Sequence, residues 1–313
     1  MKFLISLTLL LSISLSNITS KLHDSNKKPL FTKDSLDKLR ATAPYEVYSY
    51  EEHPFKDYTL SQLKQMLGAN IESTGKRLPK TLKKSSIKDI PNYFNTLEQW
   101  PNCRIEVKNQ GHCGSCWAFA ATEVLSDRYC IESDGKTNVD LSPQDLVSCD
   151  YLNSGCNGGN LYLSWLSLKY KGVVTDSCLP YTSGEGVLQS CKWFYFKCED
   201  NTPVFKYYAK DFYNFESIDE IKQNMILKGP VEAAFQIYQD FMSYKSGIYV
   251  RNSDEKIGGH AVKVVGWGTQ ENEDYWIAQN SWGSDWAENG FFRIKIGECE
   301  FENQMIAGDA YFK

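Results

Sequence analysis

The positions of the cysteines constrain this chain more than any other feature of its sequence. There are ten cysteines in 313 residues, and none lies before Cys103. In a secreted protein most of them are expected to form disulfides. The length and the hydrophobic content of 42% suffice for a globular protein with a sizeable core. The chain therefore divides into a cysteine-free N-terminal part and a cross-linked body.

The first twenty residues, MKFLISLTLLLSISLSNITS, have the pattern of a secretory signal. Lys2 supplies the positive start, residues 3–11 are mostly apolar, and small residues follow up to Ser20. A membrane anchor is the alternative, but the apolar run is short and is interrupted by serines. We expect cleavage near Ser16 or Ser20. No later stretch approaches the roughly 18 apolar residues that a membrane span requires.

Charge divides the chain at nearly the same place as cysteine. Residues 21–88 carry 14 Lys and Arg against 8 Asp and Glu, whereas residues 89–313 carry 19 against 31. So acidic a body makes a nucleic-acid partner improbable. The opposite charges either serve solubility or allow the first part to dock on the second. The basic stretch GKRLPKTLKK (75–84) is typical of an exposed, cleavable linker, and we place the junction between Lys84 and Asp89.

Local patterns predict helices in the first half of the chain and strands in the second. Thr59 and Gln62 form a capping box before a short helix that Gly68 would end, and the apolar stretch 115–131 predicts a buried helix. Further helix starts and stops point to helices after Ser142, around 161–172 and over 217–229. Strands are expected at 261–267, 275–280 and 291–296. This order predicts an α+β fold whose two lobes could flank a cleft.

The motif NQGHCGSCWAF (109–119) contains two cysteines three residues apart, Cys113 and Cys116. Such a pair can be a redox dithiol, half of a metal site, or one structural cysteine beside one nucleophile. The start of a helix lowers the pKa of a thiol, and Cys116 stands where the helix is expected to begin. Two histidines lie in the body, His112 and His260, and His260 follows Cys116 by 144 residues. That spacing, behind a CGSCW sequence, favours a nucleophile with a distant histidine.

The body, residues 89–313, resembles the papain-family cysteine peptidases, in particular their cathepsin B-like members. Seven stretches carry the resemblance in family order: EQWPNC, NQGHCGSCWAF, SDRYCI, GCNGG, KGPVEAAF, GGHAVKVVGWG and NSWGSDWAENGFF. The resemblance implies a two-lobe α+β fold with a helical left lobe, a β-barrel-like right lobe and an active site between them. Residues 21–88 resemble, much more weakly, a short inhibitory propeptide of the cathepsin B type.

The resemblance implies a role for each of five residues. Cys116 would attack the peptide carbonyl, while His260 would hold the thiolate as an ion pair and then protonate the leaving amine. Asn280 would orient the imidazole. Gln110 would donate its amide N–H to the oxyanion, beside the backbone N–H of Cys116. Trp282 would shield the hydrogen bond between His260 and Asn280 from water.

Substrate-binding positions and disulfides follow from the same resemblance. The substrate site would consist of Gly158, Gly159, Asn160, Leu161, Ala234, Gly259, Ala261 and Gln304. The implied disulfides are Cys103–Cys130, Cys113–Cys156, Cys149–Cys191 and Cys178–Cys198, with Cys299 as a free thiol. A zinc site is disfavoured because only two histidines remain in the body. No cofactor is expected, and His112 is interpreted as a surface histidine near the cleft.

Two departures from cathepsin B change the expected specificity. The stretch CLPYTSGEGVLQSC (178–191) lacks the occluding-loop segment whose paired histidines bind a substrate's C-terminal carboxylate, and no histidine occurs between residues 113 and 259. We therefore expect an endopeptidase with little dipeptidyl carboxypeptidase activity. Gln304 stands where cathepsin B has a glutamate in its S2 pocket, which favours apolar or aromatic P2 residues. If Gln304 points elsewhere, specificity would be unchanged.

The overall prediction is a zymogen of the secretory pathway, destined for the lysosome, the phagosome or the outside of the cell. We expect it to be activated by removal of the propeptide at acidic pH, where the carboxylates of the body become protonated and bind the basic segment less well. Its partners would be protein or peptide substrates, its own propeptide and cystatin-type inhibitors. We expect a monomer without a membrane span after removal of the signal. Two alternatives remain: a catalytically inactive binding protein, which would normally lack the nucleophile, and a disulfide oxidoreductase, which would require a Cys113–Cys116 bond.

Overall fold

The structure, a computed structural model, describes residues 28–71, 87, 89–191 and 197–312. The expected signal (1–20) and the basic linker (75–84) lie outside these ranges. The expected junction is described only at Ile87 and Asp89.

A long strand, β7 (Lys256–Gln270), organises the sheet. It pairs with β4 (Val231–Tyr238) on one side and with β8 (Glu273–Gln279) on the other, and β2 (Phe94–Asn95) also pairs with it. The strand order is β3-β10-β4-β7-β8-β9-β6. The remaining strands of this sheet are β3 (Ala209–Asn214), β6 (Ile248–Tyr249), β9 (Phe291–Lys295) and β10 (Gln304–Ala310).

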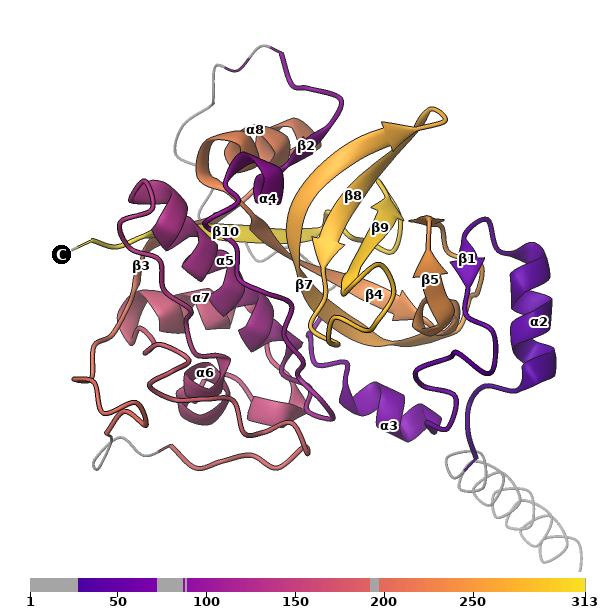
Figure 1. The fold of residues 1–313 in the computed structure, drawn as a ribbon, viewed down its shortest axis with the longest axis horizontal. Helices are drawn as coiled ribbons and strands as arrows, with labels where there is room; N and C mark the ends of the chain where they lie inside the picture. The colour runs from indigo at the N-terminus through magenta and orange to yellow at the C-terminus, as the bar shows by residue number, and fades with distance from the viewer. Residues whose placement is uncertain (1–27, 72–86, 88, 192–196, 313) are drawn as a thin grey trace, which may run out of the picture.

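The barrel-like lobe expected from the sequence is an open sheet rather than a closed barrel. Figure 1 shows its central strands β4, β7, β8 and β9. Within the described residues β3 pairs only with β10 and β6 only with β9, so the two ends of the path do not meet. The three strands expected from the sequence are present as β7, β8 and β9. The α+β class is confirmed.

The helices lie mainly on the other side of the molecule, around α5 (Cys116–Glu132). Its apolar and small side chains point in all directions, and every residue up to Ile131 is buried. The sequence-predicted caps are in place: Ser142 caps α6 (Pro143–Cys149) and Ser217 caps α8 (Ile218–Lys228). The other elements here are α4 (Thr96–Gln99), α7 (Leu161–Tyr170) and η1 (Gly155–Asn157), whereas η2 (Gln239–Ser243) lies on the sheet side after β4.

The described residues 28–71, which we call the N-terminal segment, pack against the sheet side of the body (Figure 1). Their elements are α2 (Lys33–Thr42), β1 (Glu46–Val47) and α3 (Leu60–Gln65), and β1 pairs with β5 (Tyr244–Ser246). The Thr59–Gln62 capping box is present. Helix α3 ends at Gln65, before the expected stop at Gly68, so that Met66 and Leu67 leave the helix and continue toward α5.

The described contacts between this segment and the body are mainly apolar. Phe31, Leu36, Val47 and Phe55 are among its buried members of the apolar core shared with the sheet. In the described part of the chain, the ion pair between the two parts joins Glu52 of the segment to body Lys245. In this ion pair the acidic residue belongs to the segment and the basic residue to the body. This is the opposite of the arrangement expected for a basic segment on an acidic body. Residues 28–71 carry six basic and six acidic residues, so the basic excess of residues 21–88 lies outside the described segment.

Four disulfides cross-link the body: Cys103–Cys130, Cys113–Cys156, Cys149–Cys191 and Cys178–Cys198. These are the pairs that the family resemblance implies. Cys116 and Cys299 are free and buried. Because Cys113 is bonded to Cys156, the CGSC motif is not a dithiol that closes on itself, and the oxidoreductase alternative loses its required bond.

Candidate active site

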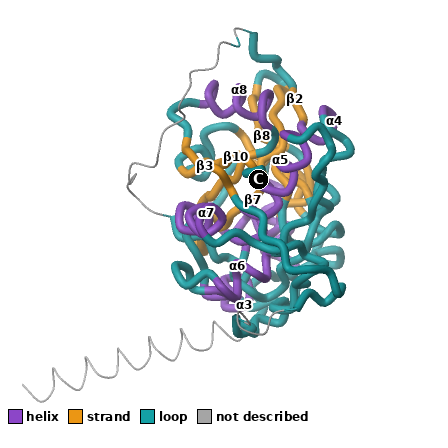
Figure 2. Tube along the Cα trace, turned by 90° about the vertical axis from the view of Figure 1, so that its left-hand side faces the viewer, coloured by secondary structure: helices purple, strands orange, loops and turns teal. Residues whose placement is uncertain are grey.

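The candidate nucleophile and base lie where α5 meets β7, two elements that run side by side (Figure 2). Cys116 is the first residue of α5, and His260 is in β7. The Cys116 sulfur is hydrogen-bonded by the backbone of Ala261, the residue after His260. Farther along the same two elements, the buried Lys263 Nζ lies 2.8 Å from Asp127 Oδ2. This ion pair fixes α5 against β7, the two elements that carry Cys116 and His260.

The orientation of the histidine follows from its hydrogen bonds. The backbone N–H of Ser281 donates to Asn280 Oδ1 at 2.8 Å, which identifies that atom as an acceptor. His260 Nε2 lies 2.7 Å from the same oxygen and must therefore carry the hydrogen. Nδ1 of the ring is buried and has no hydrogen-bond partner among the described residues. The imidazole therefore has an unprotonated Nδ1, as a base beside a thiol requires.

Trp282 packs against the imidazole. The two ring centroids are 4.7 Å apart, and Trp282 is itself buried. Phe55 of the N-terminal segment meets the indole edge-on at 5.6 Å. The hydrogen bond between His260 and Asn280 therefore lies in a water-poor, aromatic environment, in which it is stronger than in water.

Gln110 is held rigidly by its neighbours. Its backbone N–H donates to Ser281 O at 2.9 Å, and its Oε1 accepts from Ser281 Oγ at 2.7 Å. Its Nε2 donates to Cys113 O at 2.7 Å and to Met66 O at 2.9 Å. The amide N–H that would bind an oxyanion thus already binds a carbonyl oxygen of the N-terminal segment.

Residues 66–71 of this segment cover the expected substrate positions. Gly159 N donates to Gly68 O at 2.8 Å, Asn70 N donates to Gly159 O at 2.9 Å, and Ala69 N donates to Gly259 O at 3.0 Å. The approach is close at Gly68, where an added Cβ would lie 1.8 Å from the carbonyl oxygen of Gly114. Only glycine fits there, because any side chain would push the segment away from the loop that precedes Cys116.

The covering segment leaves the thiol and the imidazole uncharged. Burial raises the pKa of the Cys116 thiol to about 11, although hydrogen bonds from the backbone of Ala261, Gly68 and Trp117 lower it. Burial also lowers the pKa of His260 to about 4, against the hydrogen bond to Asn280. Both groups are therefore neutral near pH 7 in this state, and an ion pair between them requires water or substrate in place of the segment.

The other expected substrate residues form an apolar wall. Gln304 is paired with Ala234 across β10 and β4, and Ala234 with Ala261 across β4 and β7. Ala69 belongs to the same buried cluster as Leu161, Ala234 and Ala261. Gly158 lies against Gly68 O, whereas the Asn160 side chain caps α7 by accepting from Leu163 N. Six of the expected substrate residues thus lie around 66–71: Gly158, Gly159, Leu161, Ala234, Gly259 and Ala261.

Sequence reasoning missed several residues of this arrangement. Ser281 anchors Gln110 and Asn280, and its only signal was its place inside the NSWG motif. Tyr181, in the CLPY stretch, hydrogen-bonds to Gln110 and Ser115. His112 is half-buried, with its ring 5.4 Å from that of Tyr58 in the N-terminal segment, rather than free on the surface. These contacts join residues far apart in sequence, which no local pattern indicates.

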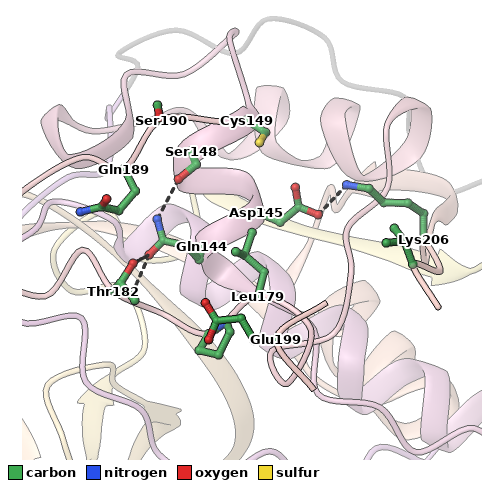
Figure 3. Close-up of a pocket in the computed structure, with 12 residues that line it drawn as sticks. Gln144, Asp145, Ser148, Cys149, Leu179, Thr182, Gln189, Ser190, Glu199 and Lys206 are labelled. Carbon is green, nitrogen blue, oxygen red and sulfur yellow. Dashed lines mark hydrogen bonds and ion pairs between the residues drawn. The ribbon is translucent and has the colours of Figure 1, made fainter. Parts of the chain in front are cut away.

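A separate cavity of about 530 Å³ lies beside α6 (Figure 3), and neither Cys116 nor His260 is among its lining residues. Its buried polar side chains already bond to one another. Gln144 Nε2 donates to Ser148 Oγ at 2.8 Å, and Lys206 is paired with Asp145. Glu199 at the rim is exposed to solvent. Its described lining includes no histidine and no free cysteine, and none of its buried polar side-chain atoms lacks a hydrogen-bond partner.

The described ranges contain no helix both long and apolar enough to cross a membrane. Among the same residues, no group of His, Cys, Asp or Glu side chains is arranged to hold a metal ion.

Residues 90–308 match the model of the papain family cysteine proteases, and the chain belongs to that family. Within it, the chain is similar to cathepsin B of Dictyostelium discoideum, with 40% identity over 233 residues that cover 70% of this chain and 74% of the relative. It is also 40% identical to cathepsin B-like CP2 of Giardia intestinalis over 226 residues, with the same shares covered. The solved structure of proCathepsin B S9 from Trypanosoma congolense matches with a TM-score of 0.81 and 28% identity, over 91% of this chain and 100% of that one.

Proposed function

We propose that this cathepsin B-like cysteine protease is an endopeptidase that works through Cys116, His260 and Asn280 and is kept inactive by its N-terminal segment as a propeptide. The observation that carries the proposal is that residues 66–71 bind Gln110, Gly159 and Gly259 directly over Cys116. A segment in this place excludes substrate from the nucleophile. The similarity to a procathepsin over 91% of the chain supports the zymogen.

Each proton in the proposed reaction has a defined place. After the segment leaves, the Cys116 thiol passes its proton to His260 Nδ1, and the thiolate attacks the peptide carbonyl. Gln110 Nε2 and the backbone N–H of Cys116 stabilise the oxyanion. His260 then protonates the leaving amine and becomes neutral. A water molecule gives a proton to His260 Nδ1 as it attacks the thioester carbonyl, and that proton returns to the Cys116 sulfur as the carboxylic acid product leaves. Asn280 keeps Nε2 occupied throughout, so that Nδ1 is the nitrogen that faces sulfur.

The endopeptidase part of the proposal rests on the stretch 178–191, which carries no histidine to capture a substrate's C-terminal carboxylate. The test compares two matched peptides, one with a free C-terminus and one amidated, and follows dipeptide release and internal cleavage. We expect internal cleavage of both peptides at similar rates. Efficient dipeptide release from the free peptide, with poor release from the amidated one, would refute this part.

The wall formed by Ala234, Ala261 and Gln304 predicts a preference for apolar or aromatic P2 residues. An arginine at P2 would find no carboxylate at Gln304 and would lose a charge-assisted hydrogen bond of ~1.5–3 kcal/mol. We therefore expect kcat/KM for a Phe-Arg dipeptide amide to exceed that for Arg-Arg by roughly 10- to 100-fold. Gln304→Glu should reduce this ratio by a similar factor. An unchanged ratio in Gln304→Glu would show that residue 304 does not face the P2 side chain.

The buried His53 suggests how acid releases the segment. Its Nδ1 accepts from Phe55 N at 3.0 Å, so Nε2 donates to Ser243 Oγ of the body, also at 3.0 Å, and the ring is neutral. The rings of Phe31, Tyr48 and Phe55 surround it. Burial lowers its pKa from 6.5 to about 4.

The sign of the effect follows from linkage, because the released segment binds a proton at His53 more tightly than the docked one. Docking is thus fully stable above about pH 6.5 and weakens as pH falls toward 4, by about 3 kcal/mol at pH 4. We expect self-processing of the full chain to accelerate steeply over this range. His53→Gln should flatten that rise and slow processing at pH 4 by more than about tenfold.

The mature enzyme supplies a matched control for this test, because His53 leaves with the propeptide. Once activated, both proteins should have identical kcat/KM values and pH profiles. If the rate of self-processing rises equally steeply with falling pH in wild type and in His53→Gln, the pH response must come from other groups, such as the carboxylates of the body.

A further inference from the structure

Tyr181 joins the two halves of the expected oxyanion site. Its hydroxyl oxygen lies 2.9 Å from Gln110 O and 2.9 Å from Ser115 Oγ. Gln110 provides the side-chain donor of that site, and Ser115 directly precedes Cys116, which provides the backbone donor. One side chain thus contacts both loops from which the two donors come.

The direction of these hydrogen bonds is fixed by the atoms involved. A carbonyl oxygen only accepts, so Tyr181 donates its single hydroxyl proton to Gln110 O. The tyrosine oxygen must then accept from Ser115 Oγ. The alternative acceptor for Ser115 Oγ, Cys113 O, is 3.5 Å away and gives a weaker bond. The result is a chain of two hydrogen bonds in which Ser115 Oγ donates to the Tyr181 hydroxyl and the hydroxyl donates to Gln110 O.

The ring of Tyr181 is itself fixed on the helix that carries the nucleophile. It meets Phe119 edge-on, with centroids 4.6 Å apart, one turn after Cys116 in α5. The loop that continues from Tyr181 also touches the Gln110 loop, because His112 N donates to Gly184 O at 2.7 Å. Gln110 is held from its other side by Ser281, as described above, so that Tyr181 completes its support.

The hydroxyl keeps its proton throughout the working pH range, since burial raises the pKa of Tyr181 to about 12. Its contribution is therefore geometric and does not change with pH.

We propose that Tyr181 is a positioning residue that sets the spacing between the Gln110 amide and the backbone N–H of Cys116 in the oxyanion site. This inference rests on the proposed cysteine-protease mechanism and deepens it. Tyr181 acts through Gln110 and Ser115 rather than on substrate. Because oxyanion donors bind the transition state more strongly than the ground state, a change in their spacing lowers kcat and leaves KM nearly unchanged.

The test uses full-length zymogens, activated at acid pH and titrated for active sites. Tyr181→Phe removes the hydroxyl and keeps the ring against Phe119, and we expect kcat to fall about 5- to 30-fold with KM within twofold. A peptide aldehyde, whose adduct with sulfur carries an oxyanion, should lose affinity by the same factor. The matched peptide acid should bind as before. Tyr207→Phe, at a half-buried tyrosine of the same apolar cluster, is the control and should leave all values unchanged.

A double variant separates positioning from general stability. In a Gln110→Ala background, Tyr181→Phe should cost less than about twofold, because one of the two oxyanion donors whose spacing it sets is gone. A multiplicative loss there, or a rise in KM with kcat unchanged, would overturn the inference. If Tyr181→Phe does not fold, Ser115→Ala removes the other end of the chain and should lower kcat in the same direction. If the activated wild-type protein cleaves peptides no faster than Cys116→Ala, the proposed function itself would be refuted.

Discussion

Replacing Cys116 with alanine should reduce peptide hydrolysis by the activated enzyme at least about 10⁴-fold, because no other group can form the thioester. The alanine keeps α5 intact and fits a fully buried position, so the zymogen should still fold. It should also remain unprocessed at acid pH unless active wild-type enzyme is added. The measurement is kcat/KM on an internally cleaved peptide, together with the size of the chain after incubation at pH 4.

Cys299 provides the matched control for this prediction, since it is the second free and buried cysteine of the described chain. Burial raises the pKa of its thiol, with no catalytic histidine beside it. Cys299→Ala should retain full activity. An epoxysuccinyl-type inactivator should label Cys116 alone, and only after the N-terminal segment has been removed. Labelling at Cys299, or activity that survives in Cys116→Ala, would contradict the proposed mechanism.

Replacing Gln110 with alanine should lower kcat by about 10²- to 10³-fold with little change in KM. The reason is that Gln110 Nε2, which binds Met66 O in the zymogen, becomes free to bind the oxyanion once the segment leaves. Gln110→Glu tests the donor more narrowly. It keeps the shape and the acceptor for Ser281 Oγ but replaces the N–H, and it should lose a comparable amount of activity.

The readout that checks this prediction is the division of the loss between kcat and KM, with the thermal unfolding midpoint measured in parallel. A variant that loses activity only because its loop is disordered should show a lower midpoint and a raised KM. A higher KM with kcat unchanged would mean that Gln110 binds the substrate in its ground state rather than the oxyanion of the transition state.

Much of the candidate site was predictable from the sequence because its parts are local motifs. The order of CGSCW, GGHAVKVVGWG and NSWG indicated Cys116, His260 and Asn280, and the structure places these residues at one junction. The contacts that support them were not predictable. Ser281, Tyr181 and Met66 act through hydrogen bonds to a loop distant from each of them in sequence, and a serine, tyrosine or methionine alone gives no signal of such a partner.

The sequence by itself determined the features that depend on near neighbours: the start of α5 at Cys116, the caps of α3, α6 and α8, and three strands of the sheet. Tertiary structure alone decided that the sheet stays open, that residues 66–71 cover the nucleophile, and that the N-terminal segment shares an apolar core with the sheet. The tertiary structure also buries Cys116, His260 and His53, and burial shifts their pKa values so that all three side chains are neutral near pH 7. The physical reason is that caps and periodicity are set by residues a few positions apart. Burial, and with it a pKa, depends on what the rest of the chain places around a group.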